Sequence, residues 1–295
     1  ATATAKCQLA GRPARGVKKH DWAAAHADLP NYQLWHRLLF PLALVYRQAA
    51  AYVGLMTVKI RLYVDHLLVE GQTVLLNRDQ SHYLFSVMRQ RLGAQVALFN
   101  GCDGEWRAQV TDANKRSGVL RCLEQTRGLQ KPPDLWLFFA PIKKARTDFI
   151  VEKAAELGVA KIFPVQTDFT NSERIKQDRL QAHAIEASEQ CGGTFVPKVH
   201  GLQKLEQVLL DWPAERRLMF CDETTAGEGR MLANVGAGPW AILIGPEGGF
   251  SKPERTCLNA MTQSQGISLG PRILRADTAA VAAITLWQLS LGDWK

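Results

Sequence analysis

The stretch from Trp240 to Trp287 constrains the fold most, because two short apolar segments within it each end in a glycine-proline loop. The first segment, Trp240–Ile244, is a nearly unbroken apolar run, which is typical of a strand buried on both faces of a sheet. It stops at Gly245–Gly249, whose three glycines and one proline exclude helix and strand. Such a loop also lets the backbone approach a bound molecule closely.

Each of the two loops leads into an expected helix. Ser251–Glu254 provides a capping serine and a helical first turn after the first loop. Ile267–Leu269 is expected to form the second strand, which breaks at Gly270. Asp277 is the expected cap of a last helix that runs over residues 278–291. Because ligands of open α/β sheets bind beyond the carboxyl ends of strands, near helix N-termini, the two loops predict a ligand site.

Between residues 135 and 221, strand-like apolar segments alternate with helix-like segments. This alternation predicts an α/β fold with a parallel sheet flanked by helices. The expected strands are Leu135–Ala140, Ala160–Val165 and Arg217–Cys221, and the expected helices are Thr147–Leu157, Arg174–Cys191 and Leu202–Leu210.

From Val58 to about Gln130 the apolar residues follow a period of two, which indicates strands. Closely spaced strands around a single helix predict a small β-barrel. The expected strands are Lys59–Val64, Thr73–Leu76, Gln95–Phe99, Glu105–Val110 and Val119–Leu123, and the expected helix is Asp79–Arg91. We therefore expect three parts: an extension over 1–55, the barrel over 56–126, and the α/β domain over 127–295.

The first 55 residues carry seven Lys or Arg against two Asp, a net charge of +5, which leaves +3 of the total +8 for the rest of the chain. Three interpretations remain open for this segment: a targeting peptide, a disordered basic arm, or an upstream extension of a domain that begins at Met56. We favour the extension. The mildly basic remainder permits a nucleic-acid partner without requiring one.

The six cysteines are scattered, without a C-x-x-C pair or a histidine at metal-ligand spacing. We therefore expect free thiols, a cytoplasmic setting and no metal site. No run of eighteen apolar residues occurs, so no membrane-spanning helix is expected.

Four separated motifs resemble the RsmE family, the SPOUT-class methyltransferases that methylate uracil N3 at position 1498 of 16S ribosomal RNA. The motifs are LIGPEGGFS (243–251), LGPRILRADTAA (269–280), DFIVEKAAELGVAKIFPV (148–165) and AIEASEQCGG (184–193). The match covers about Val58–Leu291 and preserves the order of the motifs. The resemblance implies a PUA-like RNA-binding barrel followed by a SPOUT domain with a C-terminal trefoil knot. It also implies a homodimer, S-adenosylmethionine as the methyl donor, and 16S ribosomal RNA or the small ribosomal subunit as the partner.

By this resemblance the cofactor lies against the two glycine-proline loops, where bare backbone groups face the adenine. The apolar members of the set, Leu243, Ile273 and Leu274, have plain core packing as an equal alternative. The cofactor-binding candidates are Leu243, Ile244, Gly245, Gly249, Leu269, Gly270, Ile273 and Leu274.

Methylation at uracil N3 requires loss of the N3 proton, because the neutral imide is a poor nucleophile. Arg275 and Arg272 are candidates for stabilising the developing oxyanion or for holding a phosphate; the alternative is a solvated or dimer-facing charge. Glu247 is a candidate proton acceptor, or else caps a helix or solvates its loop. The sulfonium is already a strong leaving group, so much of the remaining catalytic task is positioning.

An RNA-facing surface is expected from basic residues in both folded parts. The candidates are Arg61, Arg89 and Arg91, with Arg107 beside them in the barrel, and the basic turn Lys143-Lys144 in the α/β domain.

The chain departs from the family pattern at Ala276-Asp277, where Thr-Glu is usual, and at Gly193, where Arg is usual. These departures keep two alternatives open: a SPOUT methyltransferase for another RNA target or atom, and a catalytically idle RNA-binding assembly factor.

Overall fold

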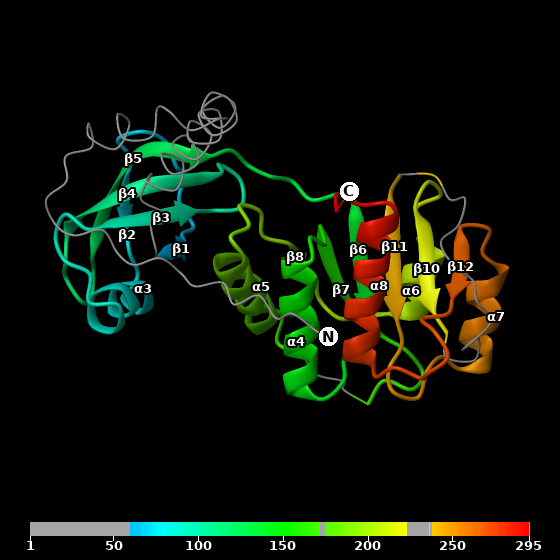
Figure 1. Cartoon of the computed structure of the whole chain (residues 1–295). Coiled ribbons are helices and arrows are strands. Elements are labelled where there is room, and N and C mark those ends of the chain that lie inside the picture. The colour runs from blue at the N-terminus through cyan, green and yellow to red at the C-terminus, as the bar shows by residue number, and fades with distance from the viewer. Residues whose placement is uncertain (1–59, 172–174, 223–235, 237, 295) are drawn as a thin grey trace, which may run out of the picture. The chain divides into compact units, whose positions relative to one another are not determined.

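The computed structural model describes residues 60–171, 175–222, 236 and 238–294. The expectations for residues 1–55 lie outside this range. Figure 1 shows two sheets that follow one another along the chain. The exact residues at which we expect the domains to begin and end stay predictions. Within the described ranges, no helix combines the length and the apolar character that a membrane crossing requires.

The C-terminal sheet is parallel throughout, as predicted. Its order is β12-β10-β11-β6-β7-β8, with the short β9 also paired to β7. Its strands are β6 (Leu135–Phe139), β7 (Lys161–Gln166), β8 (Lys198–Val199), β9 (Gln203–Lys204), β10 (Arg217–Cys221), β11 (Trp240–Ile244) and β12 (Ser264–Ile267). All five residues of β11 are buried, which confirms the prediction of a strand covered on both faces.

Helices cover both faces of this sheet. One core contains the strand residues Ile242 and Ile244 with the helices α4 (Lys144–Glu156), α5 (Gln177–Cys191) and α8 (Ala276–Ser290). The other contains Ala241 and Leu243 with α6 (Leu205–Leu210) and α7 (Lys252–Ala260). Alternate β11 residues therefore point to opposite faces, as strand geometry requires.

The N-terminal sheet has the order β1-β3-β4-β5-β2 and curls into a half-barrel (Figure 1). Its apolar core contains Val64, Val96, Leu98 and Leu120. The strands are β1 (Arg61–Tyr63), β2 (Thr73–Leu75), β3 (Gln95–Phe99), β4 (Glu105–Asp112) and β5 (Val119–Arg127). The predicted strands are all present, and β5 extends four residues further than expected.

The helix predicted over Asp79–Arg91 is shorter and less regular than expected. It consists of α3 (Arg78–His82), with a capping box between Asn77 and Gln80, and a π-helical turn, η1 (Tyr83–Val87). Arg89 then has φ 53°, an uncommon conformation for a residue with a side chain.

Two boundaries near the C-terminus were predicted wrongly. The last strand is β12, Ser264–Ile267, which ends two residues before the expected end at Leu269. The last helix has Arg275, not Asp277, at its N-cap and begins at Ala276. Ala276 and Ala279 are buried against the sheet, and Asp277 lies in the first turn, where a carboxylate is favourable near the helix N-terminus.

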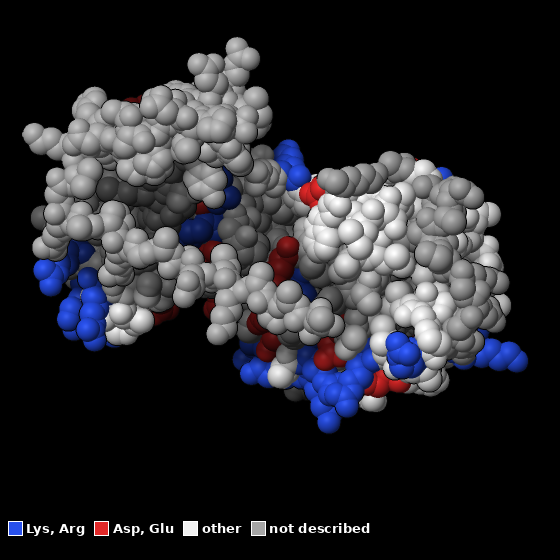
Figure 2. Space-filling model, in the orientation of Figure 1, with Lys and Arg blue, Asp and Glu red and all other residues white. Residues whose placement is uncertain are grey.

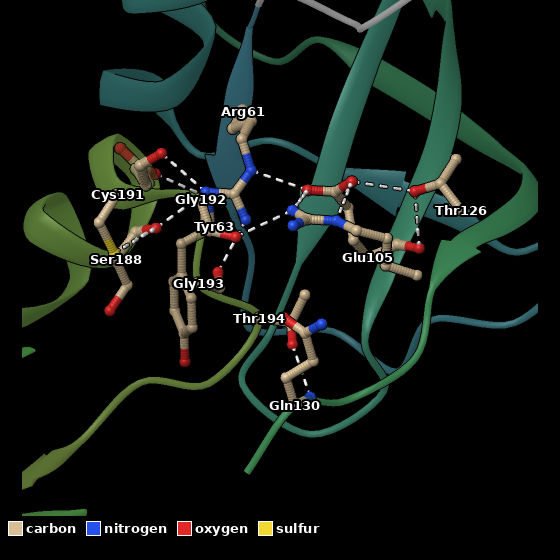
Figure 3. Close-up of polar contacts among 12 residues, drawn as sticks. Arg61, Tyr63, Glu105, Thr126, Gln130, Ser188, Cys191, Gly192, Gly193 and Thr194 are labelled. Atoms are coloured by element: carbon tan, nitrogen blue, oxygen red, sulfur yellow. Dashed lines mark hydrogen bonds and ion pairs between the residues drawn. The ribbon is translucent and has the colours of Figure 1, made fainter. Parts of the chain in front are cut away.

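An ionic cluster connects strand β1 of the half-barrel to the C-terminal end of α5 (Figure 3). Arg61 Nε donates to Glu105 Oε2 at 2.7 Å, and its other two nitrogens donate to the carbonyl oxygens of Ser188, Glu189 and Gly193. Arg127 also donates to Glu105 and to the Gly192 carbonyl.

Candidate functional site

Three neighbouring parallel strands end at the same level and form the floor of a pocket. Cys221, the last residue of β10, is in register with Ile244 of β11 on one side and Ile267 of β12 on the other. The loops that follow the three strands therefore meet at one edge of the sheet, the position where α/β proteins bind ligands.

The pocket joins the two glycine-proline loops that the sequence singled out. Of the predicted cofactor residues it includes all but Leu243. Its lining is Cys221, Asp222, Ile244, Gly245, Pro246, Glu247, Gly249, Ile267, Ser268, Leu269, Gly270, Arg272, Ile273, Leu274, Ala276 and Ala279. Leu243 is buried in the core on the α6 and α7 side of the sheet.

The sequence analysis missed Cys221, Asp222, Ala276 and Ala279 as lining residues. The rule that carboxyl ends of parallel strands meet was available for Cys221, the last residue of a strand predicted with correct bounds, and for Asp222, the residue after it. Burial raises the pKa of the Cys221 thiol to about 12, so the thiol stays protonated and forms a neutral wall. Asp222 is buried, with Arg255 Nη1 3.8 Å from its carboxylate.

Glycines shape both loops. Gly270 has φ 109° and Gly249 has φ 68°, conformations that side chains with a Cβ rarely adopt. At Gly245 a Cβ would lie 3.2 Å from the ring of Phe250, which packs beneath the loop. The loops therefore run close to the pocket without side chains at these positions.

Backbone groups of these loops are free to bind a ligand. Among the described residues, no protein group forms a hydrogen bond with the backbone of Gly245, Leu269, Ile273 or Leu274. Such free N–H and C=O groups match the hydrogen-bonding edge of a purine, and the apolar side chains of Ile244 and Leu269 match its faces. The cavity has a volume of about 70 Å³ and is open on one side, so a nucleoside-sized ligand would extend beyond it.

The three predicted catalytic residues lie at the rim of this pocket or beside it. Glu247 and Arg272 are exposed lining residues. Arg275 is exposed at the N-cap of α8 and is not part of the lining. No protein partner binds the side chains of these three residues within the described part of the chain. All three are thus available to a substrate.

Lysine and arginine side chains gather at the edge of the parallel sheet where its strands end, along the lower border of that domain in Figure 2. Lys143 and Lys144 are exposed there, at the start of α4. Arg146 follows them and lies 3.7 Å from Asp277 of α8. An ion pair therefore joins the first turn of α4 to the first turn of α8 at the Asp277 departure.

The predicted arginines of the half-barrel differ in their availability. Arg89 and Arg91 are exposed, whereas Arg107 pairs with Glu124 on the neighbouring strand. The side chain of Arg61 is 14% exposed, and each of its guanidinium nitrogens donates to a protein oxygen. The donors of Arg61 are therefore engaged within the protein and not offered to a phosphate. Gly193, the second departure, supplies one of its carbonyl partners.

Comparison with protein families defines the class. The model of the RNA methyltransferase domain matches residues 130–288, which contain the parallel sheet and the pocket. The model of the RNA methyltransferase PUA domain matches residues 76–121 of the half-barrel. Fold and pocket together are those of a SPOUT-type RNA methyltransferase.

Individual relatives identify the family more narrowly. The chain is 31% identical to ribosomal RNA small subunit methyltransferase E of Rickettsia conorii, over 76% of this chain and 93% of the relative. A structure of the enzyme of that name from Neisseria gonorrhoeae, bound to S-adenosyl methionine, has a TM-score of 0.71 at 29% identity and covers 80% of this chain and 99% of that one. A methyltransferase from Legionella pneumophila in complex with the same cofactor has a TM-score of 0.74 at 28% identity, covering 79% of this chain and 98% of that one. The chain belongs to the ribosomal RNA small subunit methyltransferase E family.

Proposed function

We propose that this protein transfers a methyl group from S-adenosylmethionine to uracil N3 at position 1498 of 16S ribosomal RNA. The observation that carries the proposal is the pocket where β10, β11 and β12 end, with its unpaired backbone groups. Its residues fit the cofactor, since the loops offer main-chain donors and acceptors between apolar side chains. Ile244, Gly245, Gly249, Leu269, Gly270, Ile273 and Leu274 would hold the cofactor.

The bound cofactor supplies an electrophilic methyl group on a sulfonium. In the reaction the N3–C bond forms as the S–C bond breaks, and the N3 proton must leave. Glu247 is the candidate acceptor because its exposed carboxylate lies at the pocket rim. Arg272, on the opposite loop, would stabilise the negative charge that develops on the uracil oxygens as N3 loses its proton.

Arg275 is a second candidate, beside Arg272, for a cation that contacts the substrate. Arg275 lies three residues after Arg272, at the N-cap of α8. Its side chain is exposed and makes no capping hydrogen bond. This position suits either the uracil oxygen or the phosphate next to it, and the favourable field of a helix N-terminus supports an anion there.

The proposed RNA surface combines Lys143 and Lys144 with Arg89 and Arg91 of the half-barrel. All four are exposed, and cationic side chains neutralise phosphates without reading sequence. The family supports three further proposals: a homodimer, a trefoil knot in the C-terminal part, and a cytoplasmic location where ribosomes are available.

The decisive experiment incubates the purified chain with small ribosomal subunits that lack the modification and with S-adenosylmethionine labelled in the methyl group. We expect label in 16S ribosomal RNA, at N3 of uridine 1498, when nucleosides and fragments are mapped by mass spectrometry. Label at another nucleotide or atom would show that the enzyme has a target other than N3 of uridine 1498. Cofactor binding without transfer to any RNA would leave an RNA-binding assembly factor as the better description.

A further inference from the structure

Phe169 is an aromatic residue at the ligand-binding edge of the sheet to which the reaction above assigns no role. It lies three residues after the end of β7, and 47% of it is exposed. Single exposed apolar residues are common on protein surfaces and need no function. Phe169 differs from them in how its loop is held and in what its ring contacts.

The loop of Phe169 is fixed within itself. The Thr167 N–H donates to Thr170 Oγ1 at 2.8 Å, and the Thr170 N–H donates to the Thr167 carbonyl at 3.1 Å. The two hydroxyl groups also lie 2.8 Å apart, within hydrogen-bond distance. Both threonines are buried, so the exposed phenylalanine stands at the tip of a rigid turn.

The same turn is tied to the N-terminus of α7. Ser251 Oγ donates to Asp168 Oδ2 at 2.5 Å, and the Asp168 N–H donates to Glu254 Oε1 at 2.9 Å. Glu254 also completes the capping box of that helix by accepting from the Ser251 N–H at 2.8 Å. Ser251 is separated from the first pocket loop by Phe250 alone, so the turn is anchored close to the end of that loop.

The ring itself lies against the first pocket loop. A Cβ added to Gly248 would be 3.3 Å from Phe169 Cβ and 3.6 Å from Cγ and Cδ2, so the glycine backbone packs closely on the side chain. The residues on either side of Gly248, Glu247 and Gly249, line the cofactor pocket. One part of Phe169 thus contacts the rim of the pocket, while the rest remains exposed.

The strand order brings cationic side chains to the same edge of the sheet as this ring. The strand β6 lies between β7 and β11, and the chain that leaves its carboxyl end leads to the exposed Lys143 and Lys144. An aromatic face next to cationic groups is the arrangement with which proteins bind unpaired nucleotides, since the base stacks on the ring and the cations contact the backbone.

We propose that Phe169 is the stacking platform for the uridine that receives the methyl group. This inference rests on the proposed function, because a base whose N3 is modified must leave its pairing partner and be held outside the helix. Stacking on Phe169 orients the uracil plane at the pocket rim, with its N3 edge toward the cofactor. Phe169 is a substrate-positioning residue, and the rigid turn reduces the entropy lost on binding.

Kinetics of three substitutions test the proposal with small ribosomal subunits as substrate. Phe169→Ala and Phe169→Leu should lower kcat/KM for the subunits by roughly 10- to 100-fold, the range of one lost base–aromatic stack. Phe169→Tyr keeps the ring and should retain the activity of the unsubstituted chain. The leucine variant is the matched control because it keeps an apolar side chain but has no aromatic face.

Cofactor affinity, measured by calorimetry, should be unchanged in all three variants. Equal activity of the leucine variant and the original chain would overturn the proposal. A loss of cofactor affinity that parallels the loss of activity would overturn it too, because Phe169 would then only support the pocket loop.

A photochemical cross-link tests the contact without any substitution in the protein. Small subunits carrying 5-iodouridine at position 1498 are irradiated in complex with the full chain, and the linked peptide is identified by mass spectrometry. We expect the link at Phe169. A link elsewhere would overturn the proposal, whereas a link at Phe169 in a protein that transfers no methyl group would refute the proposed function and leave the stacking position standing.

Discussion

Arg61 of the half-barrel donates a 2.7 Å hydrogen bond from Nη2 to the carbonyl oxygen of Gly193, which follows α5 in the other sheet's domain. Nη1 of the same guanidinium binds the carbonyls of Ser188 and Glu189, and Nε binds Glu105. Helix C-termini leave their last carbonyls unpaired and slightly negative, so a cation is favourable there. Arg61 thus acts as a side-chain cap for a helix far away in the sequence.

Arg61→Lys should destabilise the fold by about 3 kcal/mol, since a lysine cannot reproduce the planar fork and leaves the buried Glu105 with one partner fewer. The measurement is chemical denaturation. Arg107→Lys is the matched control, because Arg107 pairs with Glu124, which is 54% exposed, and should lose less than about 1 kcal/mol. Equal losses would contradict a special role for Arg61.

Acid should weaken the same cluster. Burial opposes ionisation of Glu105, but hydrogen bonds from Arg127 and Arg61 outweigh it and lower the pKa of this carboxyl below its ordinary value of 4.5. The stabilisation from ionised Glu105 is therefore complete above pH 4.5. It is lost as the pH falls from 4.5 through the lower pKa of Glu105 in the folded state. Glu189 opposes this trend, since burial raises its pKa. Comparing denaturation of the chain and of Glu105→Gln across this range isolates the contribution; identical pH dependence would contradict it.

Gly270→Ala should reduce cofactor affinity. An alanine at φ 109° costs on the order of 1–3 kcal/mol and would move the loop that carries Leu269 and Ile273, although open space surrounds the Cβ position. Calorimetry with S-adenosylmethionine should show roughly a tenfold weaker affinity, in proportion to about 1.4 kcal/mol. Gly128→Ala, also in open space but without a positive φ, serves as the control and should bind normally.

Arg275→Ala should lower turnover on the order of 100-fold, as expected for loss of a group that stabilises developing charge. Because the Arg275 side chain is exposed and caps nothing, the free energy of unfolding should change by less than about 0.5 kcal/mol. Methyl transfer and denaturation are measured on the same preparation. A normal rate would remove Arg275 from the site and leave Arg272 as the candidate cation.

Cys221 should resist alkylation although it borders the pocket. Its pKa of about 12 keeps the thiol neutral, and the thiolate is the nucleophilic form. Among the cysteines that the structure describes, iodoacetamide should modify the exposed Cys102, Cys191 and Cys257 before Cys221. Peptide mapping after brief treatment gives the order, and early modification of Cys221 would contradict the prediction.

The fold was predictable wherever burial leaves a periodic pattern. The bounds of β10 and β11 agree with the sequence prediction because both strands lie inside the sheet and, apart from the exposed Arg217, are apolar. The edge strand β12 was misplaced, since Ser264, Gln265 and Gly266 give no strand signal. A Cβ at Gly266 would lie 3.1 Å from the ring of Phe220, so a larger residue there would press on this ring.

The site was predictable only in part. Glycines mark the two loops in the sequence, but nothing local marks Cys221, which reaches the pocket because β10 lies between β11 and β12. The role of Arg61 is equally invisible, since its partners Ser188 and Gly193 are more than a hundred residues away. Strand order and long-range pairing are properties of the folded chain.

The main-chain lining of the pocket has a consequence for how this family diverges. Amide and carbonyl groups at Gly245 and Leu269 persist whatever residue occupies their neighbours, so replacing those neighbours alters the walls but leaves the binding groups in place. Substitutions around the loops are therefore tolerated as long as the glycines that set the course of the loops stay in place. A pocket built in this way depends on the path of the main chain more than on the identity of its side chains.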